Sequence, residues 1–92
     1  MGRLDDKVAV VTGAGSGAGR AISLALAAKG AKVAAVGRTF AKVEETARLT
    51  NPGSVIRPYL ADVGDGLAVS QLIPQITADL GPIEILVNNA GI

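Results

Sequence analysis

Residues 7–19 read KVAVVTGAGSGAG, and this stretch decides the fold. Its first part, residues 7–12, is short, apolar and β-branched, which is typical of a strand covered on both faces of a parallel sheet. Four glycines follow at alternate positions: Gly13, Gly15, Gly17 and Gly19. A helix is predicted over residues 18–29, because apolar side chains recur there at spacings of three and four, and Gly30 stands where a left-handed helix stop belongs. The stretch therefore predicts a strand, a tight turn and a helix in succession.

The rest of the chain continues this alternation. Strands are predicted at residues 32–36, 55–60 and 83–87. Helices are predicted from Thr39, as N-cap, to about Leu49 and over residues 66–80. Strands that alternate with helices favour right-handed crossovers and a parallel sheet with helices on both faces. The predicted fold is therefore α/β, a doubly wound parallel sheet built as β-α-β-α-β-α-β.

Two prolines refine this prediction. Pro58 cannot donate a ladder hydrogen bond, so its strand is placed at a sheet edge, in agreement with a strand order of 3-2-1-4. Pro74 removes the bond to the Ser70 carbonyl and predicts a kink in the last helix. The apolar face of that helix is predicted to consist of Val69, Leu72, Ile73 and Ile76. The fourth strand is largely apolar on both faces, which makes an unpaired edge there an association hazard.

Composition excludes several classes of protein. The chain has 92 residues, of which 49% are hydrophobic and 18% charged, so it is predicted to fold as one small domain. It contains no His and no Cys, which excludes disulfides, thiol nucleophiles, thiolate or imidazole zinc sites and His-based triads. Nine scattered basic residues against eight acidic ones suggest no nucleic-acid partner, and no apolar run reaches the roughly 20 residues that span a bilayer. We expect a cytoplasmic protein with no membrane, nucleic-acid or metal partner.

The glycine turn is a candidate anion site. Glycine lets backbone N–H groups come close to a pyrophosphate, and the N-terminus of the following helix supplies unpaired donors and a positive dipole. Gly13, Gly15 and Ala18 match the dinucleotide-binding pattern G-x-G-x-x-G/A between a strand and a helix. A tight turn without a ligand is the alternative. Ser16 is either a phosphate or ribose contact or an ordinary turn residue.

The same turn resembles a known family. Thr12-Gly13, Gly17 and Gly19 are similar to the T-G-x-x-x-G-x-G signature of the short-chain dehydrogenases/reductases. The resemblance covers essentially the whole chain but only the amino-terminal part of such an enzyme, and it implies a Rossmann-type fold. One departure is Ala18, where the family usually has Ile.

Two downstream motifs agree with the resemblance in order and spacing. Asp62 and Val63 follow the third strand, and the resemblance implies that Asp62 accepts a hydrogen bond from the adenine amino group while Val63 offers backbone contacts. A turn or helix-capping acid is the alternative for Asp62. The Asn-Asn-Ala-Gly run follows the fourth strand, and Asn89, Ala90 and Gly91 are implied to line the cofactor cleft. A structural turn without a ligand is the alternative for that run.

The end of the second strand bears on the choice of cofactor. An NAD site of this kind carries an acid about 20 residues after the loop, yet no carboxylate lies between Asp6 and Glu44. Arg38 stands there instead, and guanidinium groups pair with phosphate, so NADP is predicted ahead of NAD. A solvated loop residue is the alternative. The predicted cofactor-binding residues are Gly13, Gly15, Ser16, Gly17, Ala18, Gly19, Arg38, Asp62, Val63, Asn89, Ala90 and Gly91.

The resemblance also implies a reaction, the transfer of a hydride between a nicotinamide and an alcohol or carbonyl substrate. In that family a Tyr, a Lys four residues later and a Ser handle the proton. Tyr59 is followed at that spacing by Val63, so it is assigned to packing, and no catalytic residue is predicted in this chain. The chain alone is expected to be inactive and to form the dinucleotide-binding part of a longer enzyme, a homodimer or homotetramer by resemblance. The alternative is a non-catalytic dinucleotide-binding or sensing module.

Overall fold

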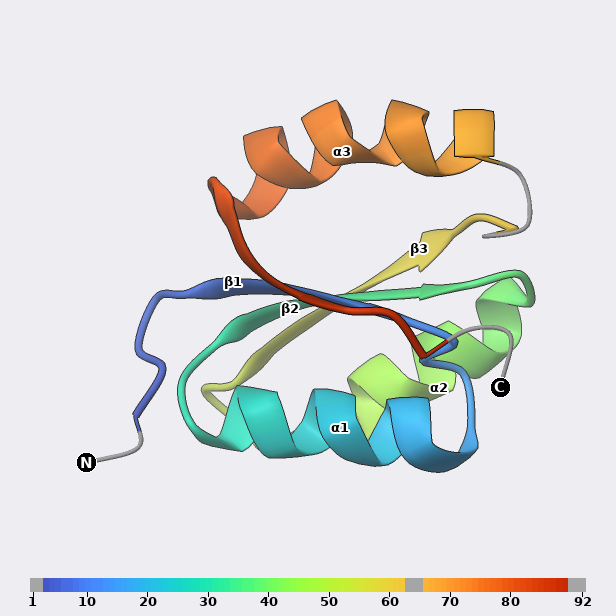
Figure 1. The fold of residues 1–92 in the computed structure, drawn as a ribbon. Coiled ribbons are helices and arrows are strands. Elements are labelled where there is room, and N and C mark those ends of the chain that lie inside the picture. Colours follow the sequence, from blue (N-terminus) through green and yellow to red (C-terminus); the bar gives the residue numbers. More distant parts are fainter. Residues whose placement is uncertain (1–2, 63–65, 90–92) are drawn as a thin grey trace.

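The computed structural model describes residues 3–62 and 66–89, and it shows a parallel sheet between two layers of helices (Figure 1). The elements are β1 (Val8–Thr12), α1 (Gly17–Ala28), β2 (Lys32–Gly37), α2 (Phe40–Arg48), β3 (Val55–Leu60), α3 (Gly66–Leu80) and β4 (Ile83–Val87). The four strands lie in the order β3-β2-β1-β4, and all pairings between neighbours are parallel. The predicted α/β fold and the edge position of β3 are confirmed.

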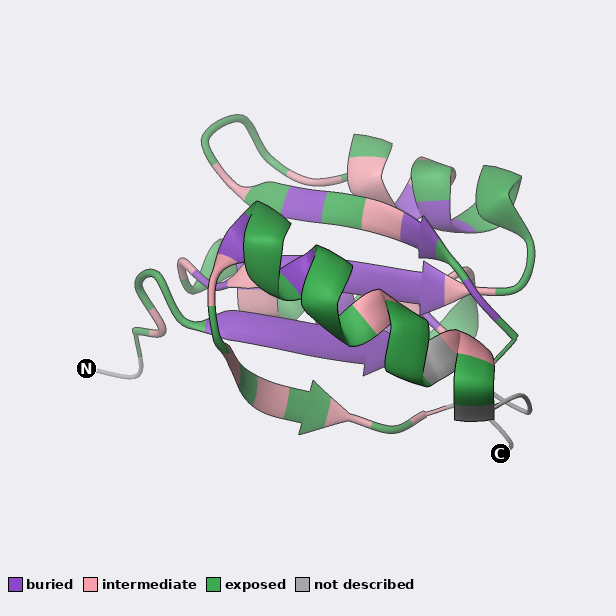
Figure 2. Ribbon diagram, turned by 90° about the horizontal axis from the view of Figure 1, so that it is seen from above, coloured by how far each residue is buried: buried purple, intermediate pink, exposed green. Residues whose placement is uncertain are grey.

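The core has two halves because side chains of the strands alternate between the two faces of the sheet. Helices α1 and α2 cover one face, and α3 covers the other (Figure 1). The side chains buried on the α1 and α2 side include Ala9, Val11, Val33 and Ala35. Those on the α3 side include Val8, Val10, Ala34 and Val36. Strands β1 and β2 therefore form the buried centre of the molecule, as Figure 2 shows. Each fully buried valine contributes roughly 1.5–3 kcal/mol to stability.

The predicted boundaries agree closely with the observed ones. The bounds of β3, α3 and β4 are those predicted. Strand β1 begins one residue later, α1 is displaced by one residue, β2 ends one residue later and α2 ends at Arg48. The predicted stop after α1 is confirmed. Gly30 has a φ of +99°, and its N–H donates to the carbonyl of Ala27 at 3.0 Å. A Cβ on Gly30 would meet the carboxylate of Asp5, but this is the end of an exposed side chain that can move aside, so the positive φ is what favours glycine there.

Two details of the helices differ from expectation. Thr39 occupies the N-cap position of α2, but its side chain forms no capping hydrogen bond. Ile73 was expected on the apolar face of α3, yet it is 49% exposed, while Ile76 and Leu80 are buried. The buried row of α3 follows a spacing of four residues through Leu72, so Ile73 is rotated by about 100° towards solvent.

Pro74 lies inside α3 and does not end it, because the helix continues to Leu80. Because Pro74 has no N–H, it donates no hydrogen bond to the carbonyl of Ser70. Thr77 Oγ1 donates to the carbonyl of Ile73 at 2.8 Å, which supplies one side-chain bond in this part of the helix. The kink at Pro74 stays a prediction.

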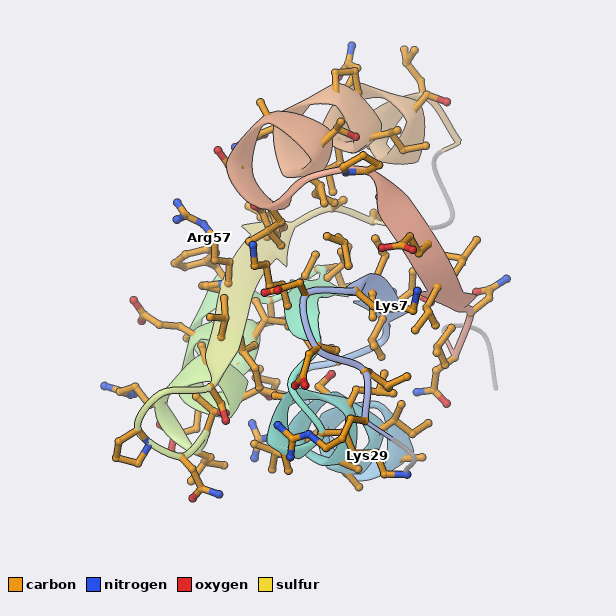
Figure 3. All side chains as sticks on the ribbon, turned by 90° about the vertical axis from the view of Figure 1, so that its left-hand side faces the viewer. Lys7, Lys29 and Arg57 are labelled. Carbon is orange, nitrogen blue, oxygen red and sulfur yellow. The ribbon has the colours of Figure 1, made fainter. Side chains whose placement is uncertain are left out.

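The exposed cations of the sheet's amino-terminal side are dispersed. In the view of Figure 3, Lys7, Lys29 and Arg57 lie apart from one another on separate parts of the chain. Lys7 forms an ion pair with Glu84 at 3.2 Å. These three cations therefore form no continuous basic surface. Among residues 3–62 and 66–89, no helix has both the length and the apolar character that a bilayer span requires.

Tyr59 joins the edge strand β3 to the helix layer above it. The residue is 5% exposed, and its hydroxyl donates to Asp79 Oδ2 at 2.7 Å. Burial, and then the hydrogen bond and the negative charge of Asp79, raise the pKa of Tyr59 from 10.0 to about 12, against the opposing effect of Arg57. The tyrosine therefore packs as predicted and also forms a hydrogen bond to α3.

This hydrogen bond predicts a dependence of stability on alkaline pH. Because the pKa of Tyr59 is higher in the folded state, its contribution is complete below pH 10.0 and is lost as the pH rises towards about 12. Tyr59→Phe should remove this loss and should lower the free energy of unfolding at neutral pH by about 1 kcal/mol, the net value of one hydrogen bond. Urea unfolding of both proteins at neutral pH and at about pH 11 measures the two effects. An equal alkaline loss in both proteins would contradict the assignment.

Candidate functional site

The connection between β1 and α1 has its shape because glycines occupy it. Gly13 and Gly17 have φ values of +62° and +57°, a left-handed conformation that costs other residues roughly 1–2 kcal/mol. A Cβ on Gly19 would overlap the carbonyl oxygen of Gly13, and one on Gly15 would lie 2.9 Å from the Cβ of Lys42. The missing side chains therefore allow β1, α1 and α2 to meet at one point.

Close packing of α1 on β1 depends on Gly19 rather than on Ala18. The spacing G-x-G-x-x-G/A assigns the third small residue to Ala18, but this residue is exposed. Gly19 is buried, and a Cβ there would also lie 2.9 Å from Asn89 Nδ2. Because Ala18 faces outward, its departure from the family's Ile leaves no gap in the described core.

The start of α1 presents backbone donors to the outside. Ser16 is the N-cap, with extended backbone, and its side chain forms no capping hydrogen bond. The N–H of Arg20 donates to the carbonyl of Ser16 at 3.3 Å. The N–H groups that precede it at a helix N-terminus have no intrahelical acceptor and carry the positive end of the helix dipole. Gly17 and Ala18 are exposed, so an anion can reach this end of the helix.

A cavity of about 200 Å³ lies between this turn and the connection from β2 to α2. The described residues that line it are Gly13, Gly15, Ser16, Gly37, Arg38, Thr39 and Lys42. Three predicted residues of the loop are therefore brought together with Arg38. The described lining holds two cations and no carboxylate, which favours an anionic ligand. Lys42, on the exposed side of α2, was not predicted from the sequence.

The end of β4 is tied to the same turn through the hydroxyl of Thr12. Thr12 Oγ1 accepts a hydrogen bond from the N–H of Asn89 at 3.0 Å. The hydroxyl lies 3.1 Å from Asn88 Oδ1 and 3.4 Å from the carbonyl oxygen of Val87, and its single proton serves one of them at a time. Asn89 Nδ2 lies 3.4 Å from the carbonyl oxygen of Gly13. Asn89 therefore lies beside the turn, and its place along a cofactor cleft stays a prediction.

The other predicted residues, Asp62, Val63, Ala90 and Gly91, are not among the described residues that line the cavity. Asp62 is exposed just after β3, and the N–H of Ala61 donates to the carbonyl of Gly37 at 2.9 Å, so this end of β3 lies beside the end of β2. Asp62 is not among the described residues that line the cavity. Val63, Ala90 and Gly91 lie outside the described residues.

Two residues that sequence reasoning missed hold the turn from behind. Arg20 Nη2 donates to the carbonyl of Gly15 at 2.7 Å, and Thr46 Oγ1 donates to the carbonyl of Ala14 at 2.7 Å. Arg20 Nε also donates to Thr46 Oγ1 at 2.9 Å, across the interface of α1 and α2. One signal was available. A cation in the first turn of a helix opposes the helix dipole and calls for a compensating partner.

Comparison with known proteins identifies the family to which this chain belongs. A family model described as short chain dehydrogenase matches residues 7–92. The chain belongs to the short-chain dehydrogenase family. The D-threitol dehydrogenase of Mycolicibacterium smegmatis is 44% identical over 91 residues, which are 98% of this chain and 35% of that protein. This member of the family therefore spans about a third of the length of that relative.

Solved structures of short-chain dehydrogenases agree with the fold. A Burkholderia xenovorans protein described as a short-chain dehydrogenase/reductase superposes with a TM-score of 0.92 at 43% identity, over 100% of this chain and 39% of that one. A metagenomic short-chain oxidoreductase in complex with NADP gives a TM-score of 0.89 at 33% identity, over 97% of this chain and 41% of that one. The predicted Rossmann-type fold and family are therefore confirmed.

The steric role of Gly19 can be separated from the conformational role of Gly17. Gly19→Ala should lower the free energy of unfolding by about 3 kcal/mol or more, because the new Cβ overlaps backbone that cannot move aside. Gly17→Ala should cost only about 1–2 kcal/mol, because nothing lies within 4 Å of its Cβ and only the left-handed φ is strained. Denaturant unfolding of the two variants compares them. Equal losses would show that close approach to Gly13 is not the constraint at Gly19.

Proposed function

We propose that this chain is the NADP(H)-binding part of an oxidoreductase that transfers a hydride between a nicotinamide cofactor and an alcohol or carbonyl substrate. The observation that carries the proposal is the cavity in which the glycine turn meets Arg38 and Lys42. A diphosphate with a further phosphate nearby has the negative charge that such a cavity favours. When bound, the cofactor would supply the hydride.

The residues of the turn fit the diphosphate of a dinucleotide. Side chains are absent at Gly13 and Gly15, so the backbone of the turn is accessible from the cavity. The N-terminal amides of α1 lie in the same region, and the Ser16 hydroxyl is not engaged in a cap. The proposed role of the turn is to bind the diphosphate through main-chain N–H groups, with Gly17, Ala18 and Gly19 supplying the start of the helix.

The 2′-phosphate of NADP is the proposed partner of Arg38. Arg38 and Lys42 line the cavity at the end of β2, where NAD enzymes of this fold carry an acid. Thr39 lines it too, and its hydroxyl is free of a capping role. The similar metagenomic oxidoreductase was solved in complex with NADP, which is in line with this assignment. Two cations around one dianion favour NADP over NAD, and we propose NADP as the cofactor.

The adenine and the rest of the cofactor are assigned to the neighbouring strand ends. Asp62 follows β3 and is proposed to accept a hydrogen bond from the adenine amino group, with Val63 beside it. Asn89 lies against the turn at the end of β4, which supports its place along the cleft. Ala90 and Gly91 are proposed to continue that side of the cleft.

Proton transfer and substrate binding are assigned to the remainder of a longer protein. The chain spans 35% of the D-threitol dehydrogenase that it resembles. Tyr59 is a poor candidate for the catalytic tyrosine, because its hydroxyl donates to Asp79 and its pKa is raised to about 12, which makes the proton harder to release. We therefore assign no catalytic residue to this chain.

The cofactor preference is tested by reversing one charge. Arg38→Asp in the full-length protein should raise the Kd for NADPH by about 10- to 100-fold, the value of a lost charge-assisted hydrogen bond, and should leave the Kd for NADH nearly unchanged. Lys42→Gln should have a smaller effect in the same direction. Titration of the fluorescence of each reduced cofactor measures both constants.

The matched control for this test is Arg48→Asp, which reverses a charge on the exposed side of α2, where Arg48 pairs with Glu45. This variant should bind NADPH as the wild type does. An unchanged ratio of the NADPH and NADH constants in Arg38→Asp would remove the case for NADP. Binding of NADPH without oxidation or reduction of any alcohol or carbonyl compound would favour a sensing module.

A further inference from the structure

Arg20 and Thr46 form a clamp behind the glycine turn. Thr46 is fully buried in α2, and its hydroxyl donates to the carbonyl of Ala14 at 2.7 Å while accepting from Arg20 Nε at 2.9 Å. Arg20 Nη2 donates to the carbonyl of Gly15 at 2.7 Å and to that of Lys42 at 3.1 Å. Two successive carbonyls of the turn are therefore held by donors on the helices.

Holding these carbonyls also fixes the direction of two amides. In a planar trans peptide the C=O and the N–H point in opposite directions, and no described peptide bond is cis. The peptide with the Ala14 carbonyl carries the N–H of Gly15, and the peptide with the Gly15 carbonyl carries the N–H of Ser16. These two amides therefore point away from the clamp.

The amides that the clamp orients belong to the wall of the cavity. Gly15 and Ser16 both line it. The Gly15 nitrogen would lie 3.9 Å from a Cβ placed on Gly37, another residue of the wall, so this nitrogen lies close to the end of β2. Carbonyl oxygens aimed into the same space would repel a phosphate. The clamp keeps their negative ends on the opposite side.

We propose that Arg20 and Thr46 are positioning residues that aim the Gly15 and Ser16 amides at the diphosphate of the dinucleotide. The inference rests on the proposed function. Neither residue needs to touch the cofactor, since Arg20 already serves three acceptors and Thr46 is buried. The effect should be the same for NADPH and NADH, because both carry the diphosphate. This distinguishes the clamp from Arg38, which discriminates between them.

The test compares binding of NADPH and NADH to four variants of the full-length protein. Thr46→Val keeps the shape and removes the hydroxyl, and it should raise both Kd values by the same factor of about three to ten. Thr46→Ser keeps the hydroxyl and should bind as the wild type does. Arg20 is half-buried, and Arg20→Gln should raise the Kd values of both cofactors as Thr46→Val does.

Ser23→Ala is the control for a loss of stability alone. Ser23 is as buried as Thr46, and its hydroxyl donates to the carbonyl of Gly19 at 2.8 Å, within α1 rather than in the turn. This variant should lower the melting temperature without changing either Kd. Tight binding by Thr46→Val, or equal weakening in Ser23→Ala, would overturn the inference. If Thr46→Val does not fold, tight binding by Arg20→Gln overturns it. A wild type that binds neither cofactor would reject the proposed function itself, and the inference with it.

Discussion

The structure depends on the close approach of Gly19 to Gly13. Because Gly19 carries no Cβ, the first turn of α1 lies directly on the end of β1, where any side chain would overlap the Gly13 carbonyl. That contact directs the N-terminus of α1 towards the carboxyl ends of the strands. The side chain of Asn89 also lies close to Gly19, so the position of the end of β4 depends on the absence of a Cβ at Gly19 as well. One steric constraint therefore places the helix dipole, the turn and β4 relative to one another.

Around this contact, hydrogen bonds from side chains hold main-chain groups. Thr12 holds the backbone after β4, and Arg20 with Thr46 holds the backbone of the turn. The bonds of Thr12 and Thr46 join elements that are far apart in the sequence, whereas the bond from Arg20 to the Gly15 carbonyl spans five residues. The site is therefore built mainly from backbone that is fixed by buried or half-buried polar groups, and only Arg38 and Lys42 add exposed charge to the described wall.

Much of the fold could be predicted from local patterns, because strands and helices each have a characteristic short-range spacing of apolar residues. The apolar runs gave the bounds of β3 and β4, and Pro58 indicated the edge of the sheet. Ile73 was assigned to the buried face because it is apolar and lies next to Leu72. The pattern of apolar residues does not show at which residue the buried face of a helix ends. Arg20, Thr46 and Lys42 were missed for a different reason. Their contacts cross between α1, α2 and the turn, and nothing in their spacing shows which backbone carbonyl they reach.

The two edge strands of the sheet, β3 and β4, differ in how well they can pair with a further strand. At β3 the strand contains Pro58, which lacks one of the donors that a neighbouring strand would need, and Tyr59 fastens that strand to α3. At β4 no proline interrupts the strand, and Leu86 is 68% exposed. An additional strand, whether from the same polypeptide or from another molecule, would thus be accommodated beside β4, and lateral extension of this sheet has a built-in direction.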